Sequence, residues 1–395
     1  FLLDTGVSKP IIFNFFNLKE ELSIHETELI YIQGLGNEQP VEALRSSNNT
    51  VIIGEAVTLN QDLFAIIDAS INFAPSLGIP IHGIIGYDIF KDFVVEINYS
   101  RKFIKLYNPL FYDSKLSRKW RKLDLIFYNK KPIVEASITN QNQVVPVNLL
   151  IDTGGSDALW IFEDSDQSLK VPTTNFDAFL GKGLSGSIFG KRAVLESFRL
   201  KDFQLNAVNV SFPDSSSIQK AKINKFRNGS LLGDVLHRFN WVFNYKSKWV
   251  AFKKNKFFNK PFEYDKSGII MQYAGVRLVK SRIQIPNKIL GSAAANSTQS
   301  SNTLTFGSTY KFEVVPELII SDLRPDSPAH QAGLKVGDVV LSINNRNLSS
   351  LTLQNAIDQF YGPDGKRIKM IIEREGVVMK YHFKLRDLLH KKSTN

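Results

Sequence analysis

The sequence predicts a mainly β protein in which two similar β-rich units are followed by a smaller α+β module. Short runs of isoleucine, valine and phenylalanine alternate with glycine, asparagine and serine, which is the pattern of strands and turns. A motif at residues 2–6 recurs at residues 150–154. After residue 258 the composition changes and a new pattern begins.

Size and composition fit a soluble globular chain. Its 395 residues predict two or three domains, and its 43% hydrophobic and 22% charged residues are ordinary for a packed protein. The absence of cysteine excludes disulfides, thiolate catalysis and cysteine-bound metals. We find no run of about 18 or more apolar residues, so we expect no membrane span in this chain.

The net charge of +11 raises the question of a nucleic-acid partner. Lysine and arginine are scattered, with modest clusters at Lys115–Lys131 and Lys246–Lys260 that we interpret as solvated faces. No recognition helix, zinc-ligand spacing or ribonucleoprotein motif accompanies them. We therefore expect no binding of nucleic acid.

The repeat is defined by three landmarks that occur in the same order in both copies. They are Leu2–Gly6, Ile84–Gly86 and Asn98–Tyr99 in the first copy, and Leu150–Gly154, Leu231–Gly233 and Asn244–Tyr245 in the second. Three landmarks in register are difficult to obtain by chance, so the sequence predicts two units of similar fold.

Glycine-bearing segments between the landmarks predict hairpin tips, with Gly34 and Gly36 in the first copy and Gly183 and Gly186 in the second. Strand-like sequence also precedes the second motif, from Leu123 to Leu150 with a turn at Asn140–Asn142. The first copy lacks this part because the chain begins at Phe1. We expect a hairpin before Phe1 in the intact protein.

Each Asp-Thr-Gly triplet follows two bulky apolar residues and is matched by a later apolar-apolar-Gly sequence. With these landmarks, residues 1–255 resemble the retropepsin and pepsin class of aspartic proteases. The resemblance implies two pseudo-symmetric acid-protease β-barrel lobes, which we place at residues 1–120 and 121–258. It also implies a polypeptide substrate in the cleft between the lobes.

The resemblance makes Asp4 and Asp152 the catalytic pair. Two carboxylates about 3 Å apart cannot both ionise, so one keeps a proton and the other activates a water molecule. The residues expected to support the two loops are Thr5, Gly6, Thr153 and Gly154, with Gly86 and Gly233 in the adjoining strands. The glycine pairs at residues 34 and 36 and at 183 and 186 are the candidate flaps.

One departure from pepsin-like sequences concerns the residue after each triplet. Those enzymes carry a hydroxyl there, whereas this chain has Val7 and Gly155. A hydrogen bond to the charged carboxylate is thus missing, and we expect higher pKa values for the pair and activity at milder acidity.

The segment Ser327–Asn344 resembles the middle of bacterial PDZ domains. Thr352–Tyr361 predicts a helix, and Ser267–Val279 and Lys311–Ser321 predict the first strands. We place a PDZ-like domain at residues 259–390, with a flexible insertion at about 287–308 beside its expected carboxylate-binding loop. A peptide in the PDZ groove is an expected partner. Presenting substrates, inhibiting the cleft and bracing the protease all remain open as roles.

The predicted function is that of an aspartic endopeptidase. The alternative is a protein that no longer cleaves and acts as a peptide-binding scaffold through its PDZ domain. We expect no cofactor and no metal, because the six histidines show no metal-ligand spacing. The internal repeat favours an active monomer over a homodimer. Resemblance to exported bacterial proteins implies a periplasmic, cell-surface or secreted location.

Overall fold

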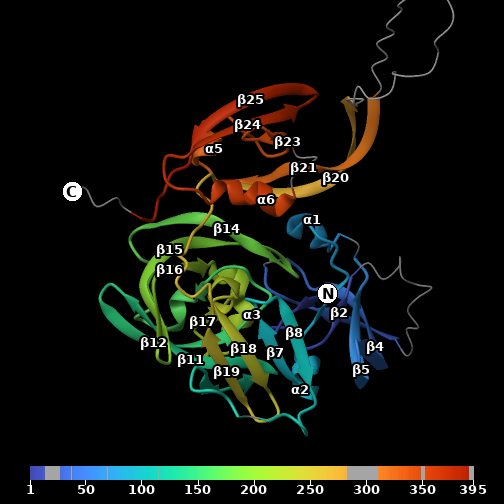
Figure 1. The fold of residues 1–395 in the computed structure, drawn as a ribbon, viewed down its shortest axis with the longest axis vertical. Coiled ribbons are helices and arrows are strands. Elements are labelled where there is room, and N and C mark those ends of the chain that lie inside the picture. The colour runs from blue at the N-terminus through green and yellow to red at the C-terminus, as the bar shows by residue number, and fades with distance from the viewer. Residues whose placement is uncertain are drawn as a thin grey trace, which may run out of the picture.

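The computed structural model describes residues 1–13, 27–36, 38–68, 70–113, 115–282, 310–347 and 352–390 (Figure 1). The insertion predicted at about 287–308 lies outside these residues. The protein is mainly β, as predicted. The family resemblances described below agree with this fold class, while the exact domain boundaries stay predictions.

The first copy of the repeat forms one sheet. Its elements are β1 Leu2–Leu3, β2 Ile11–Ile12, β3 Thr27–Ile32, β4 Val41–Ile53, β5 Ala56–Ile66, α1 Ala74–Leu77, β6 Gly83–Ile85 and α2 Tyr87–Asp92. The strands lie in the order β1-β6-β2-β5-β4-β3. β1 and β6 run parallel with Leu3 opposite Ile85, so the first landmark of the copy lies beside the second.

The second copy forms a larger sheet from longer strands. Its strands are β10 Ile126–Tyr128, β11 Lys131–Asn140, β12 Gln143–Ile151, β13 Leu159–Ile161, β14 Asn175–Gly183, β15 Gly186–Leu200, β16 Phe203–Pro213 and β17 Gly229–Leu231. Helices α3 Gln219–Lys222 and α4 Gly233–Leu236 and 3₁₀ turns at Glu163–Ser165 and Ser215–Ile218 connect them. β12 and β17 run parallel with Ile151 opposite Leu231, which repeats the arrangement of the first copy.

A further sheet joins the two copies. It consists of β7 Val94–Asn98, β8 Phe103–Tyr107, β9 Arg121–Asp124, β18 Phe239–Asn244 and β19 Trp249–Lys254. The order β8-β7-β18-β19-β9 places a strand of each copy side by side at its centre, with Ile97 opposite Trp241. The two halves therefore share one continuous set of backbone hydrogen bonds.

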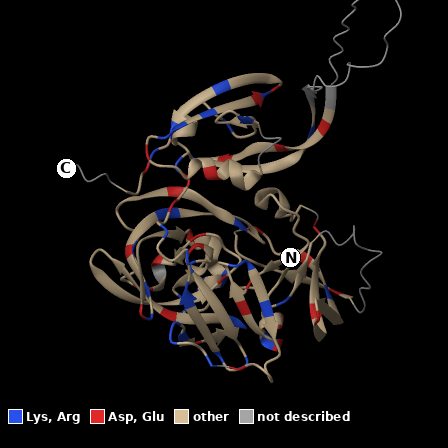
Figure 2. Cartoon of the chain, viewed as in Figure 1, with Lys and Arg blue, Asp and Glu red and all other residues tan. Residues whose placement is uncertain are grey.

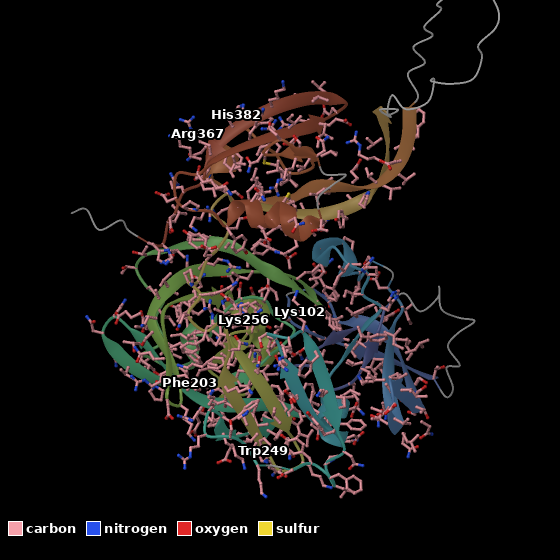
Figure 3. All side chains as sticks on the ribbon, viewed as in Figure 1. Lys102, Phe203, Trp249, Lys256, Arg367 and His382 are labelled. Atoms are coloured by element: carbon pink, nitrogen blue, oxygen red, sulfur yellow. The ribbon has the colours of Figure 1, made fainter. Side chains whose placement is uncertain are left out.

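The largest apolar core lies between this shared sheet and the sheet of the second copy. Aromatic rings pack together within it: the rings of Trp241 and Phe252 stack with centroids 5.1 Å apart, and Phe203 contacts Phe239 and Phe252 edge-on or tilted. Figure 3 labels Phe203 and Trp249 in this body and Arg367 and His382 in the C-terminal one. Large aromatic rings bury much apolar area, so these contacts stabilise the core.

The C-terminal module is a separate sheet with two short helices. Its elements are β20 Ile269–Arg282, β21 Tyr310–Leu323, α5 Pro328–Gln331, β22 Val339–Ile343, β23 Arg346–Asn347, α6 Leu353–Ile357, a 3₁₀ turn at Asp358–Phe360, β24 Arg367–Arg374 and β25 Val377–Lys384. Its strands follow the order β20-β21-β22-β24-β25, and β23 pairs with β22. The hydroxyls of Ser327 and Thr352 cap the two helices, which is why each helix begins where it does.

The module packs on the protease-like body through β20 and α6 (Figure 1). α1 of the first copy contacts β20. Gly78, which ends α1 with a positive φ of 73°, lies so close to α6 that an added Cβ would be 2.9 Å from that of Leu353. A side chain at Gly78 would thus separate the module from the first copy.

Basic (blue) and acidic (red) residues both occur along the ribbon of the two bodies in Figure 2. This agrees with the scattered lysines and arginines of the sequence. In the part of the chain that the structure describes, no helix is long and apolar enough to cross a membrane.

Candidate active site

The two Asp-Thr-Gly loops begin at the ends of equivalent strands, β1 and β12. Asp4 N donates to Ile85 O at 2.8 Å, and Asp152 N donates to Leu231 O at 2.9 Å. Each aspartate therefore lies directly after the end of its strand, where the parallel pairing of β1 with β6 or of β12 with β17 stops. The strand pairing follows from the apolar residues that precede each motif.

The carboxylates of Asp4 and Asp152 meet. The charge and side chain of Asp152 are both among the causes that raise the pKa of Asp4. A Cβ atom added at Gly6 would lie 3.0 Å from Asp4 Oδ1 and 3.3 Å from Asp152 Oδ1, and one added at Gly154 would collide with the Asp4 carboxylate. Glycine at both positions is thus required for the close approach of the two loops.

Hydrogen bonds between the two threonines join the loops. Thr5 N donates to Thr153 Oγ1 and Thr153 N donates to Thr5 Oγ1, both at 3.1 Å. The hydroxyls also donate across the interface, from Thr5 to Ile151 O at 2.7 Å and from Thr153 to Leu3 O at 2.6 Å. Each threonine hydroxyl therefore serves as both donor and acceptor, which valine could not do.

The glycines of the second landmark pack under the loops. A side chain at Gly86 would collide with the carbonyl oxygens of Asp4 and Val7, and a Cβ at Gly233 would lie 2.6 Å from Gly155 O. Gly233 N also donates to Gly155 O at 2.8 Å. The late apolar-apolar-Gly landmark thus supports the loop that carries its aspartate.

Asp4 is partly buried, and its carboxyl holds a proton more tightly than an ordinary carboxyl. Burial, followed by the charge of Asp152, raises the pKa of Asp4 to about 8, while the Gly6 N–H and the charge of Lys131 act in the opposite direction. The sequence expectation compared the pair with pepsin-like enzymes and rested on the hydroxyl missing at Val7. In the structure the largest cause of the Asp4 shift is instead the desolvation of its carboxyl.

Two cations lie near the pair, and the sequence analysis assigned neither of them to the site. Lys131, at the start of β11, lines the same cavity as Asp4 and Asp152 and is half-buried. Our interpretation of Lys131 as part of a solvated cluster was therefore wrong, because the β10–β11 turn folds toward the loops. Arg227 is buried and donates to Gly229 O and to the Ser230 hydroxyl beside β12.

A polar network steadies the chain after Asp152. The Asp157 carboxylate accepts from Trp160 Nε1 at 2.8 Å and from Ser211 Oγ at 2.9 Å, and it pairs with Arg192 at 2.9 Å. The first copy has no acidic residue at the equivalent distance from Asp4, since Lys9 stands there. The lack of a repeat partner explains why the sequence comparison did not mark Asp157.

The two glycine-bearing tips meet each other over the cavity. Gly34 N donates to Ser185 Oγ at 3.1 Å, and Ser185 N donates to Leu35 O at 3.0 Å. Gly183 lies against Leu35, and Gly186 with a φ of 103° turns the β14–β15 hairpin. Both candidate flaps therefore contribute to the cover of the cavity.

A cavity of about 1530 Å³ contains the pair and continues to the C-terminal module. The dyad loops, both tips, β20 and the segment after α6 line it, and Ile270, Ile357 and Tyr361 are the module's main apolar contributors. Segments far apart in the sequence thus border one space.

The loop before β20 lies at the end of the module's groove, whereas the insertion connects the opposite end of β20. Asp265 Oδ1 accepts from Ser267 N at 2.6 Å, from Ser267 Oγ at 2.7 Å and from Gly268 N at 3.2 Å. The position expected for the insertion at about 287–308 lies outside the residues that the structure describes. The amides of Ser267 and Gly268 already bind a carboxylate from within the chain.

Comparison with known proteins agrees with both parts of this description. Residues 134–233 match the family model described as aspartyl protease, and residues 319–374 match the model described as PDZ domain. The chain carries an aspartyl protease domain and a C-terminal PDZ domain. The aspartyl protease match contains Asp152 and Gly233. Asp4 lies outside the matched residues, and its place beside Asp152 comes from the structure.

One curated relative is similar to part of the chain. The carboxy-terminal-processing protease of Bartonella bacilliformis is 38% identical over 69 residues, which are 17% of this chain and 16% of that protein. The chain therefore spans about a sixth of the length of this relative. Within the described residues, no group of three or more histidine, cysteine, aspartate or glutamate side chains is placed to hold a metal ion.

Proposed function

We propose that the protein is an aspartic endopeptidase in which Asp4 and Asp152 act together on a water molecule. The observation that carries this proposal is the meeting of the two carboxylates at a cavity large enough for an extended peptide. The match to the aspartyl protease family and the similarity to a carboxy-terminal-processing protease support peptide-bond hydrolysis.

In the proposed step, Asp152 is ionised and Asp4 carries the shared proton. Asp152 takes a proton from the water, the hydroxide oxygen bonds to the peptide carbonyl carbon, and the carbonyl oxygen takes the proton of Asp4. Asp152 then gives its proton to the departing amine as the carbon–nitrogen bond breaks. The pair regains one proton from the acid product, so no cofactor is consumed.

We further propose that the PDZ domain helps to hold the substrate. A PDZ domain takes an extended peptide along a sheet edge beside a helix. Here that edge is β20 beside α6, and both border the cavity of the dyad. Because Asp265 already occupies the amides of Ser267 and Gly268, we expect the groove to accept an internal segment as readily as a free C-terminus.

The proposal is tested with the purified protein, its Asp152→Asn variant and an unfolded test protein between pH 4 and 8. We expect fragments from the wild type and none from the variant, with equal circular dichroism spectra. Equal cleavage by the variant would remove Asp152 from the mechanism. Binding without cleavage by either protein would support a scaffold instead.

The PDZ contribution has its own test. Ile357→Ala removes apolar surface from the cavity wall, so we expect KM to rise a few-fold with kcat unchanged. Val377→Ala, an equally conservative change at an exposed position on β25, is the matched control. An unchanged KM in the Ile357 variant would assign the PDZ domain a bracing role.

A further inference from the structure

Lys131 is the cation whose position is least explained by the fold. It begins β11, where its backbone pairs with Tyr128 across a turn formed by Asn129 and Lys130, both with positive φ. The ammonium group forms no hydrogen bond and no ion pair with any residue that the structure describes. Arg227, in contrast, uses two of its nitrogens within the protein.

The charges around the pair do not cancel. Lys131 and Arg227 bring two positive charges to a site in which the singly protonated pair has one negative charge. Burial lowers the pKa of Lys131, and Arg227 lowers it further, while Asp152 and Asp4 raise it. An excess cation in a partly desolvated place is costly until an anion joins it.

The excess charge faces the cavity rather than the protein interior. Lys131 lines the space shared by the dyad and both tips, whereas its neighbour Lys130 does not and instead lies over the Tyr87 ring. Hence the anionic group that neutralises the charge of Lys131 must enter the cavity with the bound peptide. A carboxylate is the anionic group that polypeptides carry.

We propose that Lys131 is a specificity-determining residue that binds a carboxylate of the substrate beside the scissile bond. The inference rests on the proposed peptidase function and names the class of substrate: peptides with an acidic side chain or a terminal carboxylate at this subsite. Lys131 donates to the carboxylate through its ammonium group, and the pair retains its single negative charge.

The test uses quenched fluorescent decapeptides in which each position in turn is Glu or Gln, each made with a free acid or an amidated C-terminus. Glu against Gln reports a side-chain carboxylate, and acid against amide reports the terminus. Because a hydrogen bond to a charged group contributes about 1.5–3 kcal/mol, we expect kcat/KM to favour one carboxylate by about 10- to 100-fold.

Lys131→Met keeps the length of the side chain and removes its charge. We expect the ratio of kcat/KM for the carboxylate peptide to that for its uncharged partner to fall below about 2 in this variant. Lys130→Met, the same change one residue away and outside the cavity, should keep the ratio of the wild type. Thermal unfolding of both variants checks the fold. A preference that persists in Lys131→Met, or a wild type with no preference in either arm, overturns the proposal.

A binding experiment separates this inference from the proposed function. The same peptides are titrated calorimetrically into Asp152→Asn and into the Asp152→Asn/Lys131→Met double variant, where cleavage plays no part. Tighter binding of the carboxylate peptides by the first protein alone supports the role of Lys131 even if the wild type cleaves nothing. Equal binding by both contradicts it.

Discussion

The Asp4 loop and the Asp152 loop have equivalent hydrogen bonds but different surroundings. Both aspartate amides donate to the matching carbonyl of a parallel strand, and the threonines exchange equivalent bonds. Lys131, Arg227 and Asp157 all belong to the second copy. The repeat thus accounts for the equivalent loop geometry, and residues found only in the second copy give the two carboxyls different surroundings.

The largest effect is expected when the carboxyl of each loop is removed in turn. Asp4→Asn and Asp152→Asn should each reduce kcat by at least about 10³-fold, because each group is needed for a different proton transfer. Single-turnover kinetics with one peptide substrate measure the loss. If one variant keeps activity within 10-fold of the wild type, its carboxyl is not required.

The next test concerns the bonds that join the loops. Thr5→Val leaves the partly buried amide of Thr153 without an acceptor and should lower the free energy of unfolding by about 1–3 kcal/mol. Thr153→Val should have an effect of similar size if the loops are equivalent. Urea unfolding measures both variants. The Thr5→Ser variant retains the hydroxyl and serves as control; an equal loss there would point to packing instead.

A third test uses pH. Because Asp4 must keep its proton, activity should fall as the pH rises through about 8. Lys131 lowers the pKa of Asp4, so Lys131→Met should move this alkaline limb upward. Profiles of kcat against pH measure the shift, with Lys130→Met as control. A downward shift would contradict the assignment of the proton to Asp4.

The same group links stability to pH. Folded Asp4 binds its proton more tightly than the unfolded chain does, so its contribution to stability is complete below about pH 4 and is lost as the pH rises through about 8. Asp4→Asn should remove this dependence and be more stable than the wild type at pH 9. Thermal unfolding between pH 4 and pH 9 measures the stability of both proteins. Parallel curves of stability against pH would show that Asp4 does not cause the dependence.

The smallest expected effect belongs to the tips. Ser185→Ala removes the hydroxyl that accepts from Gly34 N, a loss of about 1 kcal/mol that should raise KM by a few-fold. Ser187→Ala, in the same hairpin, is the matched control. Steady-state kinetics with one peptide measure both. A larger effect from the control would show that the hairpin as a whole, rather than this contact, matters.

The meeting of the Asp4 and Asp152 loops was predictable because the signal is local and repeated: each triplet follows apolar residues that form a parallel strand. Lys131 was not predictable in this way. Its place depends on how the β10–β11 turn lies against loops distant in sequence, and a lysine among other lysines gives no sign of that. Similarly, the missing hydroxyl at Val7 is visible in the sequence, whereas the burial that dominates the pKa of Asp4 is not.

The PDZ domain illustrates the same limit at a larger scale. Its strands, caps and turns follow from the sequence, including Gly333 and Gly376 with positive φ. Its position over the cavity involves contacts such as those of Gly78 with Leu353 and of Phe176 with Arg324, which join residues that no local pattern connects. The fold of each part could thus be predicted from the sequence, whereas the arrangement of the parts could be seen only in the structure.

The central pairing of β7 with β18 has a consequence for any attempt to divide the molecule. Cutting the chain between the copies would leave each fragment with a bare hydrogen-bonding strand flanked by aromatic residues, the kind of edge that recruits other chains. Such fragments should associate with each other or aggregate when produced alone. Co-production would be the practical route to an active enzyme in two pieces.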